Sequence, residues 1–294
     1  MTLLGCMIFF TVAHEGSFAR TAEQLHLTPS AISHAVATME AECGFPLFTR
    51  TKSGVTMTAA AESLLPAIQR LLASSESLDQ SIAQVNGMHK GVLRFGVFNS
   101  ACVTWVPELV PGYQAAYPGI EVEIYQGSYS DIAAWIKNGT VELGFLSDSC
   151  AQELDFEPLY RDPLVCIAPR GFHSRRPGHV QADELRGQNF VSQRADTDAD
   201  IQSYLKRNDL HVRTRCYVID DESTVAMVAC GQGVAIMPEM ILKTRRYREE
   251  PIDILRLEPA ASRNIGLACL DKNSLSPAAR QFWYRVREFA ARQG

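Results

Sequence analysis

The chain has 294 residues, a formal net charge of −5, and 46% hydrophobic and 21% charged residues. These values fit two or three globular domains with their own cores, and they exclude a polybasic chain and a disordered one. The apolar run at residues 3–13 has no Lys or Arg before it and is too short to span a membrane. We therefore expect it to be a first core helix, neither a signal peptide nor a membrane anchor.

Eight cysteines are scattered along the chain, without a C-x-x-C pair or a cluster with His. This spacing predicts reduced thiols, mostly in the core, in a reducing compartment, which is the cytoplasm. No nucleotide-binding, hydrolase or metalloprotease motif is present. We expect no enzyme activity, no metal and no cofactor.

Residues 17–42 have the pattern of two short, capped helices. Ser17 precedes apolar residues spaced four and three apart, and Thr28 followed by Pro29 marks a second helix start. The buried stripe of this second helix is expected at Ile32, Val36 and Met39. Besides Thr28, its outer face carries small or hydrogen-bonding residues suited to reading base edges in a major groove: Ser30, Ser33, His34, Ala37 and Thr38. Taken alone, the pattern also fits a helical pair in an ordinary bundle.

Residues 47–57 predict a short hairpin with its turn at 52–54. Arg50 and Lys52 lie near the tip of this hairpin. Two cations beside a recognition helix are placed to contact phosphates or to enter the minor groove. The hairpin therefore favours a DNA-binding role for the helical pair before it.

A long helix is predicted from Thr58 to about residue 88. Residues at alternating intervals of three and four form a heptad seam, which is apolar except at Ser75: Ala61, Leu64, Ile68, Leu71, Ser75, Leu78, Ile82 and Val85. We expect the seam to join two chains, with Leu64, Ile68, Leu71, Leu78 and Ile82 in the contact. The alternative is a helix packed on its own domain. Pro66 should kink the helix near its start.

From residue 91 onward, strand-like and helix-like segments alternate, which predicts an α/β domain with a largely parallel sheet. Strands are expected at 92–97, 120–125, 141–146, 164–168, 216–219 and 233–237. Helices are expected at 105–113, 130–138 (capped by Ser130), 201–205 and 222–231.

Polar side chains follow several of these strands where a helix begins. They are Asn99, Ser100, Ser128, Tyr129 and Thr224. Ligands of α/β domains bind outside the carboxyl ends of strands, where helix N-termini present free N–H groups. Each hydroxyl can therefore contact a ligand or serve only as a helix cap, and the sequence leaves both readings open.

The chain resembles the LysR-type transcriptional regulators over nearly its whole length and in the family's order. The segments that carry the resemblance are 16–33, Glu40 with 44–50, 91–97, 228–238 and 276–279. The resemblance implies a winged helix-turn-helix at 1–57 and a linker and dimerisation helix at 58–88. It also implies a periplasmic-binding-protein-like effector domain, with one subdomain at 91–162 and 267–294 and the other at 163–266.

The resemblance also suggests where an effector would bind. Arg161 matches a crossover position where some members hold an anionic effector, and Arg194 is a weaker candidate ahead of the helix near residue 200. Both also fit surface ion pairs. With Trp105 and Tyr129 as apolar walls, the Arg161 guanidinium and the helix-start hydroxyls of Ser100, Ser128 and Thr224 favour a small organic acid.

One departure concerns charge. Family recognition helices often carry Arg or Lys where this chain has His34, Ala37 and Thr38. Residues 1–57 contain three basic side chains (Arg20, Arg50, Lys52) against four acidic ones (Glu15, Glu23, Glu40, Glu42). Non-specific affinity for DNA should therefore be weak. We read this as stronger dependence on oligomerisation and direct readout, the alternative being weakened or lost DNA binding.

These observations predict a LysR-type regulator that binds a double-stranded promoter site as a homodimer or a dimer of dimers. A small-molecule effector is expected to shift its hold on the DNA, and RNA polymerase is a further candidate partner. The alternative is a small-molecule binding protein or enzyme that uses its N-terminal module for assembly.

Overall fold

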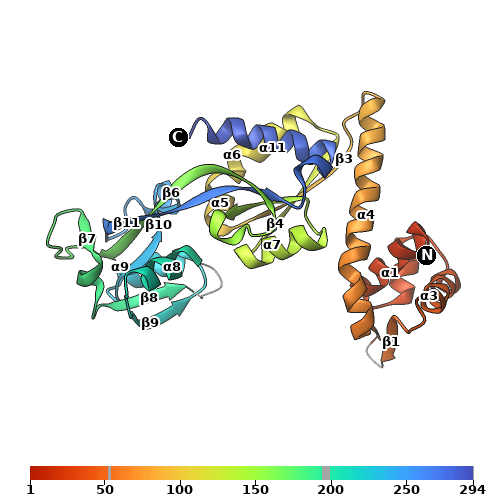
Figure 1. The fold of residues 1–294 in the computed structure, drawn as a ribbon, viewed down its shortest axis with the longest axis horizontal. Helices are drawn as coiled ribbons and strands as arrows, with labels where there is room; N and C mark the ends of the chain where they lie inside the picture. Colours follow the sequence, from red (N-terminus) through yellow and green to blue (C-terminus); the bar gives the residue numbers. More distant parts are fainter. Residues whose placement is uncertain (52–53, 194–198, 294) are drawn as a thin grey trace. The chain divides into compact units, whose positions relative to one another are not determined.

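A computed structural model describes residues 1–51, 54–193 and 199–293, with only the backbone described at residue 50 (Figure 1). The chain divides into two compact units. The first unit is Met1–Ile82 with Lys137–Thr140, and the second unit is Ala83–Ile136 with Val141–Gly294. No described helix is long and apolar enough to cross a membrane.

The first unit begins with three helices, a two-stranded hairpin and a long helix. Their bounds are α1 Leu3–Glu15, α2 Phe18–Gln24, α3 Pro29–Cys43, β1 Phe48–Thr51, β2 Gly54–Met57 and α4 Ala59–Val85. The predicted caps are confirmed: Ser17 Oγ accepts from the Arg20 N–H at 3.3 Å, and Thr28 Oγ1 accepts from the Ala31 N–H at 3.2 Å. Each satisfies a helix-start N–H that has no partner inside the helix.

The three helices and the hairpin close over a small core. One cluster joins α1, α2 and α3 through Ile8, Val12, Ala22, Ile32 and Val36. A second joins α1 and α3 to the start of α4 through Cys6, Phe9, Met39, Leu47, Ala61 and Ile68. Glu40 Oε1 accepts from the N–H groups of Leu47 (2.7 Å) and Phe48 (3.3 Å), which ties the hairpin to α3.

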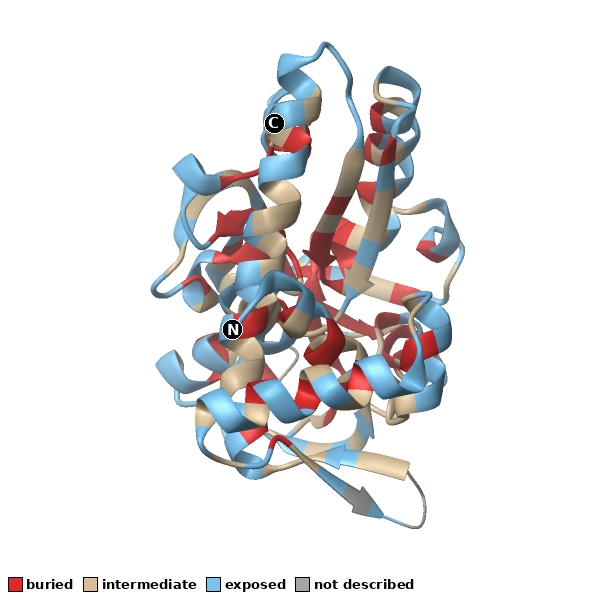
Figure 2. Cartoon of the chain, turned by 90° about the vertical axis from the view of Figure 1, so that its right-hand side faces the viewer, coloured by how far each residue is buried: buried red, intermediate tan, exposed pale blue. Residues whose placement is uncertain are grey.

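The hairpin is antiparallel, with Phe48 opposite Met57 and Thr51 opposite Gly54. Its strands are exposed or half-buried at the described positions, as Figure 2 shows. The hairpin therefore packs on the core of the first unit through Phe48, Val55 and Met57, while Thr49 and Thr56 are exposed. The predicted contact residue Lys52 and the side chain of Arg50 lie outside the described residues.

The seam of α4 changes its environment along the helix. Ala61 and Ile68 are buried in the core of the first unit, and Leu64 packs against it. Farther along, Leu71, Leu78, Ile82 and Val85 are 48%, 61%, 53% and 88% exposed. Large apolar side chains repeated on one helix face and left in water favour a partner surface. Dimerisation through this seam stays a prediction.

The second unit contains the remaining elements. Its helices are α5 Asn99–Thr104, α6 Val106–Ala116, α7 Tyr129–Asn138, α8 Ala199–Arg207, α9 Asp221–Ala229, α10 Glu239–Leu242 and α11 Pro277–Ala290. Its strands are β3 Gly91–Val97, β4 Ile120–Gln126, β5 Leu143–Ser147, β6 Asp155–Pro169, β7 His179–Gln181, β8 Asn189–Gln193, β9 Arg213–Val218, β10 Ala235–Pro238 and β11 Ile252–Cys269. Short 3₁₀ turns occur at Asp148–Cys150, Ala182–Leu185, Arg245–Tyr247 and Lys272–Ser274.

Most predicted elements are found, with one correction of a cap. The helix expected at 130–138 begins at Tyr129, and the Oγ of Ser128, not Ser130, accepts from the Asp131 N–H at 3.2 Å. Ser128 is the cap because it lies immediately before the first residue of α7. There its side chain can accept a hydrogen bond from an N–H group that has no partner inside the helix. The short helix α5 lies between β3 and α6.

The main sheet is mixed, which corrects the expectation of a largely parallel one. Its strand order is β10-β6-β11-β5-β3-β4, with β7 beside β11. β3 runs parallel to β4 and to β5, whereas β6, β10 and β11 pair antiparallel, as do β11 and β5. The reason is the path of the chain, which leaves along β6 and returns beside it along β11 (Figure 1).

These two long strands, of 15 and 18 residues, connect the largest hydrophobic cluster of the second unit with two further clusters. The larger core includes Phe95, Phe145, Phe282 and Trp283. Beyond the larger core, alternate residues of β6 belong to two further clusters. One cluster contains Leu164, Cys166 and Ala168, and the other contains Val165 and Ile167. A strand covered on both faces reads as a continuous apolar run, which is the pattern of residues 164–168. The predicted boundaries between the two effector subdomains, after residues 162 and 266, fall within β6 and β11. This division into subdomains stays a prediction.

Candidate functional sites

The second unit contains a polar cavity of about 320 Å³. It is lined by Phe98, Asn99, Ser100, Gln126, Gly127, Ser128, Tyr129, Gln193, Ile219, Asp220, Asp221, Pro238 and Arg263. These residues come from the ends of β3, β4, β8 and β10, from the segment between β9 and α9, and from β11. The volume is within the range of small-molecule pockets, and the position at strand ends is typical of α/β binding sites.

A buried ion pair lies at one side of this cavity. Arg263 on β11 stands opposite Asp162 on β6 in the strand register, and its Nε and Nη2 donate to Asp162 Oδ2 at 3.0 and 2.8 Å. The side chain of Arg263 is 4% exposed and that of Asp162 is 0% exposed. The pair therefore has little access to solvent, and its hydrogen bonds have to come from the protein.

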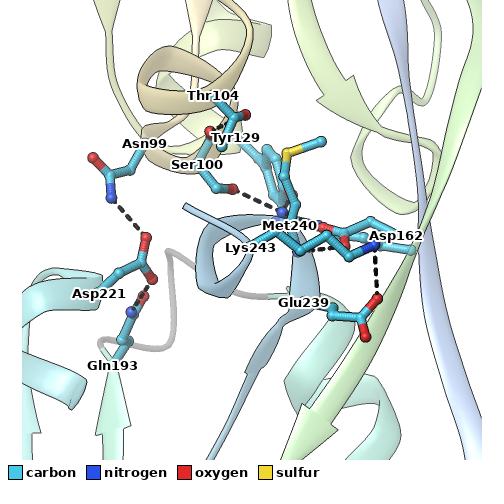
Figure 3. A network of polar contacts seen from close by, with 11 residues as sticks. Asn99, Ser100, Thr104, Tyr129, Asp162, Gln193, Asp221, Glu239, Met240 and Lys243 are labelled. Atoms are coloured by element: carbon cyan, nitrogen blue, oxygen red, sulfur yellow. Dashed lines mark hydrogen bonds and ion pairs between the residues drawn. The ribbon is translucent and has the colours of Figure 1, made fainter. Parts of the chain in front are cut away.

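The surrounding elements supply those hydrogen bonds (Figure 3). Arg263 Nη2 donates to Ser100 Oγ at 2.7 Å, and Nη1 donates to Tyr129 Oη at 2.8 Å. The Met240 N–H at the start of α10 donates to Asp162 Oδ1 at 2.9 Å. The guanidinium carbon also lies 4.9 Å from the centre of the Phe98 ring, within range of a cation–π contact. One ion pair thus connects α5, α7, α10 and both crossing strands.

Opposing effects act on the Asp162 carboxyl. Burial raises its pKa above the ordinary value, while the Arg263 charge and hydrogen bonds and the Met240 N–H favour the carboxylate. Arg263 keeps its proton throughout the physiological range. The ion pair and these hydrogen bonds therefore oppose the effect of burial on this carboxyl.

A second set of contacts crosses the cavity (Figure 3). Asn99 Nδ2, at the start of α5, donates to Asp221 Oδ2 at 2.6 Å, and Gln193 Nε2 donates to Asp221 Oδ1 at 2.8 Å. Gln126 Nε2 donates to Asn99 Oδ1 at 3.0 Å. Asp221 is 7% exposed, so a nearly buried carboxylate here receives hydrogen bonds from neutral amides.

Two helix starts at the cavity carry their own acidic side chains. At α7, Asp131 Oδ2 accepts from the Ser128 N–H at 2.9 Å and from Ser128 Oγ at 2.6 Å. These hydrogen bonds from the Ser128 side chain and backbone lower the pKa of Asp131. At α9, Asp220 Oδ1 accepts from the Ser223 N–H at 2.6 Å. Acids at helix N-termini are stabilised by the helix dipole.

The structure brings four of the predicted effector residues to the cavity: Asn99, Ser100, Ser128 and Tyr129. Thr224 is buried behind them, where its Oγ1 donates to the Asp220 carbonyl at 2.8 Å and accepts from Gln193 Nε2 at 3.2 Å. Arg194 lies outside the described residues. Whether any of them contacts an effector stays a prediction.

Two expectations about the cavity need correction. Arg161 is exposed on β6, and its Nε donates to Ser262 Oγ at 2.9 Å, so it does not line the cavity. Successive side chains of a strand point to opposite faces, so the cavity side of β6 belongs to Asp162. Trp105 is 4% exposed within the main core, packed against Phe145 and Phe289, and it does not line the cavity either.

The sequence analysis missed the charged part of the lining, which is Asp220, Asp221 and Arg263. Asp220 and Asp221 lie four and three positions before Thr224, at the start of α9, so a search for capping acids would have found them. Arg263 has no such local signal, since its partners are distant in sequence.

In the first unit, the predicted DNA-reading face of α3 is open. Ser30, His34, Ala37 and Thr38 are exposed and Ser33 is half-buried, whereas Ile32, Val36 and Met39 are buried. Thr38 Oγ1 donates to the His34 carbonyl at 2.9 Å, a local contact that leaves the face free of other elements. Thr28 acts as the N-cap of this helix.

Comparison with known families matches both units. A model of the LysR substrate binding domain matches residues 86–291, and a model of the bacterial regulatory helix-turn-helix protein, lysR family, matches residues 6–62. The uncharacterized HTH-type transcriptional regulator YvbU of Bacillus subtilis is 22% identical over 293 residues, which is 98% of each chain.

Solved structures show the same fold over the full length. Full-length OxyR from Pseudomonas aeruginosa has a TM-score of 0.79 at 20% identity, covering 99% of this chain and 94% of that one. Full-length CbnR complexed with its target DNA has a TM-score of 0.66 at 20% identity, covering 98% and 99%. At 20% sequence identity, the similarity to these two solved structures shows a shared fold and nothing more.

Proposed function

Because the chain belongs to the LysR family of DNA-binding transcriptional regulators, we propose that it binds a promoter site as a homodimer or a dimer of dimers. A small molecule in the cavity of the second unit then changes its hold on the DNA. LysR-family regulators are non-enzymatic, so the cavity serves binding and not turnover.

The observation that supports DNA reading best is the division of α3 into two faces. Its buried stripe fixes the helix on α1 and α2, while its outer face presents small and hydrogen-bonding side chains. An α-helix with such a face fits a major groove and can contact base edges. The solved CbnR relative is in complex with its target DNA, and for this chain we propose DNA binding through α3.

The exposed seam of α4 supports a dimer. Leu71, Leu78 and Ile82 each leave about half or more of their surface in water in the single chain. Pairing with a second copy would bury that surface and bring two α3 helices to one DNA site. Two half-sites related by a dyad are then expected, since protein symmetry is mirrored in the operator.

The earlier expectation of an organic acid as effector rested on Arg161 and on three helix N-termini. Arg161 is outside the cavity, and acidic side chains of the protein occupy two of the helix starts. The proposed function therefore keeps a small-molecule effector but not the argument for an acid.

The test is selection of DNA sites by the full-length protein from fragmented genomic DNA, followed by sequencing and footprinting. We expect a dyad-symmetric site. Ser33→Ala combined with His34→Ala should lower the preference for this site over random DNA by about 10- to 100-fold, because base contacts are lost. Unchanged footprint and affinity in this variant would contradict the role of α3.

Two further variants distinguish the recognition of base sequence from contact with DNA phosphates. Arg50→Ala should weaken binding to all sequences alike and reduce the salt dependence by about one ion. His211→Ala is the matched control for His34, because this histidine is 93% exposed in the second unit, and it should bind DNA as the wild type does.

A further inference from the structure

The cavity of the second unit has an unusual charge balance for a site that would hold an organic acid. Its lining contains two carboxylates, Asp220 and Asp221, and one guanidinium, Arg263. The charge of Arg263 is already paired with a third carboxylate, Asp162, at 2.8 Å. A ligand carboxylate would therefore meet an excess of negative charge with no uncommitted cation among the described lining residues.

The starts of α7 and α9 do not compensate. The positive end of α7 already faces the Asp131 carboxylate through the Ser128 N–H, and that of α9 faces Asp220 through the Ser223 N–H. The anion that a helix N-terminus favours is thus supplied by the protein itself at both places.

Asp221 differs from the other acids of the cavity. Asp162 has a guanidinium partner, and Asp220 caps α9, whereas Asp221 accepts from the side-chain amides of Asn99 and Gln193. It forms no ion pair within residues 1–51, 54–193 and 199–293, although it is 7% exposed. A carboxylate taken from water gains most from a charged donor, and each of its oxygens can accept a further hydrogen bond.

We infer that the effector of this cavity carries a protonated amine, which donates to the Asp221 carboxylate between Asn99 and Gln193. This inference rests on the proposed function, since it names the ligand class of the same cavity. The amine adds the missing positive charge and draws together α5 and α9, the two helices already joined by the contact between Asn99 and Asp221. An ammonium group with three donors also fits the amide and hydroxyl oxygens around it.

The test measures thermal stabilisation of the full-length protein by matched pairs of compounds. The pairs are L-alanine with L-lactate, phenethylamine with hydrocinnamate, and putrescine with succinate. We expect at least one amine to raise the melting temperature while its amine-free partner does not. For that amine, calorimetry on Asp221→Asn should show an affinity about 10- to 100-fold lower, because a charge-assisted hydrogen bond is replaced by a neutral one.

Asp183→Asn is the matched control. Asp183 is an exposed acid of the second unit paired with Arg175 outside the cavity, so this variant should bind the amine as the wild type does. Asp221→Glu guards against misfolding of the first variant: it keeps a carboxylate at this position, so its affinity for the amine should be higher than that of Asp221→Asn.

Three outcomes would overturn the inference: stabilisation by the acids as strong as by the amines, no stabilisation by any amine, or equal amine affinity in Asp221→Asn and wild type. DNA binding by the ligand-free protein is measured on the same preparations. A protein that selects its DNA site but ignores amines refutes the ligand class alone, whereas a protein that selects no site refutes the proposed function.

Discussion

The side chains proposed to read DNA all lie on one helix and the hairpin after it, whereas the cavity of the second unit gathers residues from distant parts of the chain. Arg263 contacts Asp162, Tyr129 and Ser100, which are 101, 134 and 163 positions away. In the first unit, the caps are bonded to residues three positions away. A local site can be inferred from spacing, but a site built across strands needs the strand register.

This difference also separates two kinds of stabilisation. The first unit relies on caps, a small apolar core and the contact of Glu40 with the hairpin. The second unit places a buried ion pair where its crossing strands meet. Loss of one member of a buried pair leaves an uncompensated charge, and that costs more than loss of a cap.

The largest effect is expected from Arg263→Ala. The buried Asp162 would lose its cation, so the free energy of unfolding of the second unit should fall by about 3–5 kcal/mol. Denaturant titration followed by tryptophan fluorescence measures this unit selectively, because the three tryptophans, Trp105, Trp135 and Trp283, all belong to it.

Arg161→Ala is the matched control, since it removes an exposed arginine from the adjacent crossing strand. Its cost should stay below about 1 kcal/mol. Equal losses in the two variants would mean that the buried pair has no special role.

The next effect concerns the seam of α4. Leu71→Glu combined with Leu78→Glu would place unpaired charges in the proposed interface between two chains, and the dimer should dissociate about 100-fold more readily. Sedimentation or light scattering over a concentration series measures this. Ser77→Glu with Gln84→Glu adds the same charge away from the seam and should leave the dimer intact. If the seam variant also stayed dimeric, the helix would have to pack elsewhere.

A smaller effect is expected at the N-cap of α3. Thr28→Ala removes the hydroxyl that accepts from the Ala31 N–H, and the helix should lose about 1 kcal/mol of stability. Hydrogen exchange of the α3 amides reports the change. Ser33→Ala, five residues farther on in the same helix, should alter the exchange much less; equal protection in the two variants would rule out the cap.

The smallest effect is expected at Glu157, a half-buried acid of the second unit. Its Oε2 accepts from Lys272 Nζ at 2.6 Å and from Trp283 Nε1 at 2.9 Å. Burial opposes the charged form, but the hydrogen bonds from Lys272 and Trp283 and the charges of Lys272 and Arg287 outweigh it, and the pKa is lowered below the ordinary 4.5. Glu157→Gln should therefore cost about 0.5–1 kcal/mol at neutral pH.

A lowered carboxyl pKa stabilises the folded state above the unfolded value, and this contribution is lost as the pH falls through the folded value. The difference between Glu157→Gln and wild type should thus shrink as the pH falls below about 4.5. Glu121→Gln, exposed on β4, should show little difference at any pH. A Glu157 difference that persists at acid pH would indicate lost packing instead.

Much of the fold was predictable because its signals are local. Ser17 and Thr28 as caps, the stripe of Ile32 and Val36, and the pairing of Phe48–Thr51 with Gly54–Met57 depend on residues a few positions apart. The same holds for Asn99, Ser100, Ser128 and Tyr129, which follow strands directly and therefore lie where strand ends meet.

The amino-acid sequence by itself determined the capped helices, the hairpin, the heptad seam of α4 and the alternation of strands and helices, because each depends on periodicity and on the chemistry of near neighbours. Only the tertiary structure decided that β6 and β11 run antiparallel, and that this register sets Arg263 opposite Asp162 and leaves Arg161 in solvent. Side chains on a strand alternate between faces, so a shift of one position would exchange a buried cation for an exposed one. That register is set by packing over the whole domain, and no local pattern encodes it.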